Sequence, residues 1–138
     1  DALAQPPRAA LTASWWRWGT SVIVVATVTN NSDITLSSEN NAGVHAIVKE
    51  PYAVYDTHTT IHPGLNGAMA QIPDLAPGET GTFLIVVPDI YPMDWGVLEL
   101  IVLVDYQTAP GLKYDQLQAV IAEPATQIVY LPVIKGRP

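Results

Sequence analysis

Residues 20–30, TSVIVVATVTN, decide the fold of this chain. Most of these residues are β-branched, and β-branched side chains favour the pleated backbone of a strand over a helix. Successive side chains of a strand point to opposite faces, and here both faces carry apolar residues. A strand that is apolar on both sides needs cover on both sides. The stretch therefore predicts a central strand of a layered β-protein.

Other strand-like runs surround this stretch and are separated by turn signals. The predicted strands lie within residues 11–19, 43–56, 80–88, 95–107 and 118–134. Three x-Pro-Gly sequences predict type II turns, because proline presets the first central position and glycine supplies the positive φ of the second. They are His62-Pro63-Gly64, Ala76-Pro77-Gly78 and Ala109-Pro110-Gly111. Twelve prolines and nine glycines leave little room for long helices. We therefore predict an antiparallel β-sandwich of about seven to nine strands over residues 11–138, after an extended arm at residues 1–10.

Three motifs occur in a fixed order along the chain: TVTNNSD at 27–33, YAVYD at 52–56 and LAPGETGTF at 75–83. Together they resemble the FxLYD-type bacterial β-sandwich domain and, more loosely, CARDB-like and other immunoglobulin-like modules. Tyr52 and Val54 stand where the name motif has Phe and Leu. The resemblance covers about residues 20–106 and implies an immunoglobulin-like fold, an extracytoplasmic location and no shared catalytic residues.

The charge pattern excludes several classes of partner. The chain has a net charge of −7, and only 14% of its residues are charged, whereas 49% are hydrophobic. Binding to nucleic acid needs clustered Lys and Arg, which the chain lacks, and the same argument disfavours an anionic membrane surface. No apolar run is long enough to span a membrane. So few charges indicate either a partly covered surface or one built from Thr, Ser, Asn and Gln.

No arrangement of residues predicts catalysis, a metal or a cofactor. His58 and His62 would lie about 13 Å apart on a strand, too far to bind one zinc ion. The carboxylates are dispersed and mostly adjoin turns, the serines lack a Gly-x-Ser-x-Gly elbow, and a blue-copper site would need a cysteine, of which there is none. Asn30-Asn31-Ser32 fits an N-glycosylation sequon, but it also ends the best strand, so we interpret it as turn chemistry.

The SWWRWG stretch at 14–19 is the first candidate contact region. In an extended strand Trp16 and Trp18 share one face, and Trp15 and Arg17 share the other. Three interpretations stay open for the tryptophans: core residues, anchors at a subunit interface, or a stacking surface for sugar rings formed by Trp16 and Trp18. Arg17 could also lie on an indole face.

The C-terminal stretch IVYLPVI, residues 128–134, is the second candidate. Pro132 cannot donate a ladder hydrogen bond, so the segment belongs at a sheet edge. Its side chains are apolar on both faces, so the segment needs cover on both sides. Either the N-terminal arm of the same chain or another copy supplies that cover.

These features predict a non-enzymatic, exported structural subunit that self-associates through its terminal strands into a filament or a surface layer. The alternative is a secreted carbohydrate- or protein-binding module of the cell surface, with a polysaccharide or a surface protein as partner. The predicted contact residues are Leu11, Trp15, Trp16, Trp18, Ile128, Val129, Tyr130, Leu131, Val133 and Ile134.

Overall fold

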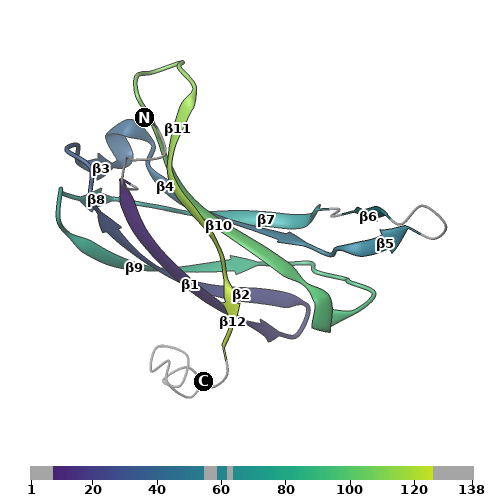
Figure 1. Cartoon of the computed structure of the whole chain (residues 1–138). Coiled ribbons are helices and arrows are strands. Elements are labelled where there is room, and N and C mark those ends of the chain that lie inside the picture. Colours follow the sequence, from purple (N-terminus) through teal and green to yellow (C-terminus); the bar gives the residue numbers. More distant parts are fainter. Residues whose placement is uncertain (1–7, 55–58, 62–63, 126–138) are drawn as a thin grey trace.

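Two four-stranded sheets face each other in the computed structural model, which describes residues 8–54, 59–61 and 64–125 (Figure 1). Sheet 1 has the order β12-β1-β2-β9, made of β12 (Glu123–Pro124), β1 (Ala9–Trp18), β2 (Ser21–Asn30) and β9 (Thr80–Val87). Sheet 2 has the order β11-β10-β4-β7, made of β11 (Tyr114–Ile121), β10 (Glu99–Gln107), β4 (Gly43–Lys49) and β7 (Gly64–Gln71). The shorter elements are β3 (Leu36–Ser37), β8 (Asp74–Leu75), β5 (Tyr52–Val54), β6 (Thr59–Ile61) and the 3-10 helices η2 (Ser38–Asn40) and η3 (Trp95–Val97).

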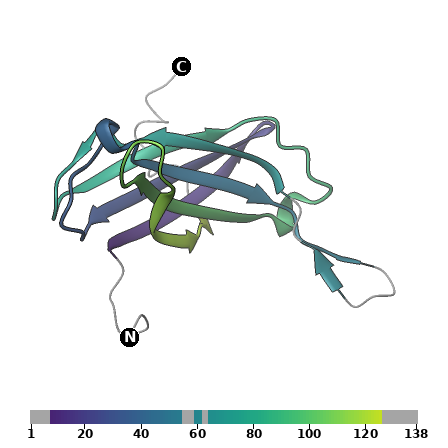
Figure 2. The ribbon, with the colours of Figure 1, turned by 90° about the horizontal axis from the view of Figure 1, so that it is seen from above.

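The strand order confirms the predicted immunoglobulin-like antiparallel sandwich. Its connections cross repeatedly between the sheets, as in Greek-key sandwiches. After β11 the chain leaves sheet 2, and β12 joins the edge of sheet 1 parallel to β1, with Glu123 opposite Ser14. The hairpin of β5 and β6 projects beyond the sandwich (Figure 2). No helix in the described part of the chain is long and apolar enough to cross a membrane.

The central strand β2 supplies the middle of the core. One face of it meets sheet 2 through Val22, Val24, Ala26 and Val28, all fully buried. Fully buried residues of β4 and β10 in sheet 2 pack against them: Val44, Ala46, Val48, Leu100, Val102 and Val104. Because a buried valine or leucine contributes about 1.5–3 kcal/mol, this layer holds the two sheets together.

β1 begins earlier than the sequence predicted. Ala9 and Ala10, assigned to an extended arm, are the first two residues of the strand. Ala10 pairs with Thr29, so the pairing with β2 includes residues that were assigned to the arm. Just before the strand, Arg8 forms an ion pair with Asp115 of β11, and this hydrogen bond raises the pKa of Arg8.

Two of the three predicted type II turns are confirmed. Gly78 and Gly111 have φ angles of +85° and +79°. The turns at 76–79 and 109–112 each close with a main-chain hydrogen bond of 3.0 Å between their first and fourth residues. His62 and Pro63 of the third predicted turn lie outside the described residues, and Gly64 begins β7.

The side chain of Asn30 ties together the loops at one end of the sandwich. It is fully buried at the end of β2. Its Nδ2 donates to the carbonyls of Ile34 (2.7 Å) and Leu75 (2.9 Å). Its Oδ1 accepts from the main-chain N–H (3.0 Å) and the hydroxyl (2.6 Å) of Ser32. Asn30 is therefore a turn residue, and its amide is not accessible for glycosylation in the folded chain.

We expect Asn30→Ala to lower the free energy of unfolding by about 2–3 kcal/mol, because it removes the Asn30 donor to the Leu75 carbonyl and the acceptor of the Ser32 N–H and hydroxyl inside the fold. Urea unfolding followed by circular dichroism measures the loss. Asn31→Ala is the matched control, because the neighbouring side chain is exposed. Equal stability of the two variants would contradict the role of Asn30.

Candidate functional site

The structure separates the predicted N-terminal contact residues. Leu11 and Trp15 are buried in the core between the sheets. They hold this position because alternation along β1 turns them toward sheet 2. Both side chains therefore pack inside the core of this chain, and their contact with a partner stays a prediction.

Trp16 and Trp18 share the outer face of sheet 1, as the alternation predicted, but they differ in exposure. Trp18 is 53% exposed, whereas Trp16 is 5% exposed. The two indoles therefore do not form the exposed pair that a sugar-stacking surface would need. The buried Nε1 of Trp16 has no hydrogen-bond partner within the described part of the chain. A buried donor of this kind costs about 1–3 kcal/mol unless an acceptor reaches it.

Half of the outer face of sheet 1 is apolar. The strand register aligns Trp16 of β1, Ile23 of β2 and Val86 of β9 in one row across the sheet. The next row places Val25 beside Leu84. This surface, the apolar outer face, consists of Trp16, Trp18, Ile23, Val25, Leu84 and Val86.

The other half of the same face is polar. Thr27 pairs with Thr82 and Thr29 with Thr80, and their hydroxyls lie 3.3 and 2.7 Å apart. This half satisfies its own hydrogen bonds and suits contact with water. The change from threonine to aliphatic residues within the same strands therefore marks out a defined apolar surface.

Ala125, the last described residue, lies at the edge of sheet 1 beside Trp15. The N–H of Ala125 donates to the carbonyl of Trp15 at 2.7 Å, one residue from Trp16. The contact residues predicted in 128–134 lie outside the described residues. His58 and His62 lie outside them too.

At one end of the sandwich, the buried carboxylate of Glu50 holds the loop before β10. Glu50 is buried, and its two oxygens accept the main-chain N–H groups of Met93 (3.0 Å) and Asp94 (2.7 Å). Beside this loop, Arg17 stacks on Trp95, with its guanidinium carbon 4.1 Å from the centroid of the ring. This stacking confirms that Arg17 lies on an indole face. Glu50 fixes a loop, so its oxygens are already engaged.

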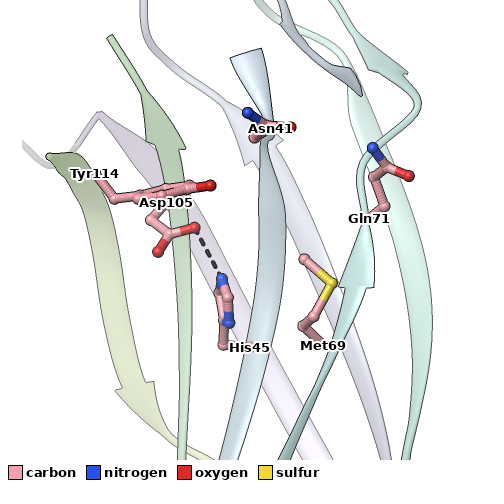
Figure 3. Close-up of a pocket in the computed structure, with 6 residues that line it drawn as sticks. All are labelled: Asn41, His45, Met69, Gln71, Asp105 and Tyr114. Atoms are coloured by element: carbon pink, nitrogen blue, oxygen red, sulfur yellow. Dashed lines mark hydrogen bonds and ion pairs between the residues drawn. The ribbon is translucent and has the colours of Figure 1, made fainter. Parts of the chain in front are cut away.

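A hollow of about 510 Å³ lies on the outer face of sheet 2 (Figure 3). We call it the sheet 2 hollow, and its lining residues are Asn41, His45, Met69, Gln71, Asp105 and Tyr114. Figure 3 shows the two edge strands flanking it, with Tyr114 on the β11 side and Gln71 and Met69 on the β7 side. The central strands supply His45 and Asp105.

Two hydrogen bonds order the polar side chains of the hollow. His45 Nε2 lies 2.9 Å from Asp105 Oδ1. Asn41 Nδ2 donates to Gln107 Oε1 at 2.9 Å. Sequence reasoning missed this group, because its members come from four strands and from the turn before β4, and they meet only in the folded chain. The sole signal was the polar residues that interrupt the outward apolar positions of β4 and β10.

Comparisons with known proteins add little. No family model and no curated protein matches the chain. Among solved structures it is similar to Spo0M, a sporulation control protein from Bacillus subtilis, with 15% identity over 84% of this chain and 49% of that chain and a TM-score of 0.46. It is also similar to a GH20 exo-β-N-acetylglucosaminidase from Vibrio harveyi, with 11% identity over 86% of this chain and 18% of that chain and a TM-score of 0.33. The chain thus spans about half of the first protein, and at these scores neither likeness carries an argument about function.

The unequal exposure of the two outer tryptophans is testable by fluorescence. We expect Trp18→Phe to shift the emission maximum to shorter wavelength and to reduce quenching by acrylamide, because it removes the most exposed indole. Trp16→Phe is the matched control and should leave the quenchable fraction almost unchanged. The opposite pattern would contradict the exposures that the structure gives to Trp16 and Trp18.

Proposed function

We propose that this chain is a non-enzymatic structural subunit that self-associates through the apolar outer face of sheet 1. The single observation that carries the proposal is the row formed by Trp16, Ile23 and Val86 on a face where a sandwich normally shows polar residues. Export to the cell exterior is part of the proposal and follows from the family resemblance.

The energetics favour further burial of this face. Trp18, Leu84 and Val86 are 53, 38 and 48% exposed. Complete burial of an aliphatic side chain contributes about 1.5–3 kcal/mol, and tryptophan is a preferred anchor of interfaces. Trp16 and Ile23 already lie under cover in the same patch. A partner that covers Trp18, Leu84 and Val86 would bury the part of this patch that is still exposed to water.

The proposed occupant is the C-terminal segment 126–138 of a second copy. It contains IVYLPVI, an uncharged stretch that matches the apolar outer face in chemistry. β12 runs parallel to β1, and Ala125, the residue before this segment, is hydrogen-bonded to Trp15 at the edge of the same sheet.

A head-to-tail contact of this kind repeats from one copy to the next. It forms a closed ring if the rotation between copies closes, and a filament if it does not. The sparse charge of the chain supports such an assembly, because few like charges oppose close contact.

Cysteine cross-linking tests the occupant directly, because the chain has no cysteine. We expect a Val86→Cys copy mixed with a Leu131→Cys copy to form a disulfide-linked heterodimer on mild oxidation. A disulfide needs Cα atoms within about 7 Å, so only docking of the segment on the face brings the two thiols together. Met69→Cys, on sheet 2, replaces Val86→Cys in the control mixture. Equal cross-linking in both mixtures, or none in either, would refute the proposed contact.

Two changes should abolish assembly without unfolding the domain. Removal of residues 127–138 deletes the proposed occupant, and Val86→Asp places a charge in the apolar face. We expect both proteins to sediment as monomers while their circular dichroism stays β-rich. Thr82→Asp, on the same strand and face but in the threonine half, should assemble normally. Assembly of the truncated protein would show that the segment is dispensable.

A further inference from the structure

The sheet 2 hollow has a lining that combines hydrogen-bonding groups with an exposed ring. Asn41 and Gln71 carry amides, which both donate and accept, and Asp105 carries a carboxylate. Tyr114 is 51% exposed, so its ring is free to meet a ligand. Met69 adds an apolar contact surface on the side opposite Tyr114 (Figure 3). The hollow thus presents polar groups between two apolar side chains.

Two glycines, Gly43 of β4 and Gly67 of β7, lie beside this hollow. The register places Gly43 between Asp105 and Gln71, and Gly67 beside Ile47. A Cβ atom at Gly43 would lie 2.5 Å from Met69 Cε, and one at Gly67 would lie 3.2 Å from a main-chain carbonyl. The methyl group of Met69 therefore lies over Gly43, whereas Gly67 borders a second depression on this face.

The hollow continues into a neighbouring depression of about 370 Å³ along β4. His45, Met69 and Asp105 line both, and the second also borders Ile47 and Leu103. A continuous groove suits an extended ligand with repeated units better than a single small molecule.

The chemistry of the lining disfavours the other ligand classes. An anion would meet the Asp105 carboxylate without a Lys or Arg among the described lining residues. A metal ion would find no group of three His, Asp or Glu side chains in the described part of the chain. A wholly apolar ligand would bury the amides and the carboxylate without hydrogen bonds, which is costly. A ligand with many hydroxyl groups satisfies both donors and acceptors, and its C–H faces suit an aromatic ring.

We propose that the sheet 2 hollow binds an uncharged polysaccharide chain, with Tyr114 stacking on a sugar ring and Asp105, Asn41 and Gln71 bonding to its hydroxyls. His45 holds Asp105 in place through their 2.9 Å contact and leaves the second carboxylate oxygen for the ligand. This site lies on the sheet opposite the apolar outer face, so it does not depend on the proposed assembly. It replaces the tryptophan pair as the sugar-binding surface of this chain.

Isothermal titration with defined oligosaccharides tests the site. The probes are cellohexaose, chitohexaose and maltohexaose, with hexagalacturonate as the anionic probe. We expect at least one neutral probe to bind and the anionic probe not to bind. Tyr114→Ala and Asp105→Asn should each weaken the binding by about tenfold or more, and Tyr114→Phe should retain it, because the ring is kept.

Two controls separate the site from its surroundings. Leu112→Ala removes an exposed apolar side chain on the same hairpin outside the hollow and should bind as the unchanged protein does. Trp18→Ala should also bind normally. The proposal is overturned if no neutral probe binds more tightly than about 10 mM, or if Trp18→Ala abolishes binding while Tyr114→Ala does not. Circular dichroism confirms that each variant is folded.

Discussion

The structure depends on one strand that is apolar on both faces. The inner side chains of β2, from Val22 to Val28, are fully buried against sheet 2 and close the sandwich. Its outer side chains, Ile23 and Val25, are apolar on a face that normally meets water, so they also need to be covered. The neighbouring strands β1 and β9 enlarge this apolar surface, because they place Trp16 and Val86 in the same row as Ile23. The strand that forms the core therefore also makes a second surface that favours contact.

The two sheets consequently have different outer faces. That of sheet 1 is half apolar and half threonine, with a sharp change between Leu84 and Thr82. That of sheet 2 carries a groove with amides, a carboxylate and an exposed tyrosine. Buried polar anchors at the loops keep both faces in place: Asn30 fixes one set of loops, and Glu50 fixes the loop before β10. Such a molecule can associate through one face while the other stays open to a ligand.

The sequence predicted the parts that depend on local chemistry. The β-branched run at 20–30 and the turns at Gly78 and Gly111 are confirmed, because strand propensity and positive φ are properties of single residues and their neighbours. The direction of each tryptophan was not predictable, since alternation gives two faces without saying which one meets the core. The sheet 2 hollow was invisible for a different reason. Apart from Asn41 in the turn before β4, its lining residues meet only through pairings between four strands.

The most direct measurement is the native mass of the intact chain by light scattering over a range of protein concentrations. Self-association through the apolar outer face predicts particles much heavier than the 14.9 kDa of one chain, with a mass that rises with concentration. A constant mass of one chain at every concentration would contradict it. In that case the apolar outer face would be covered within a single molecule, and no second copy would be needed.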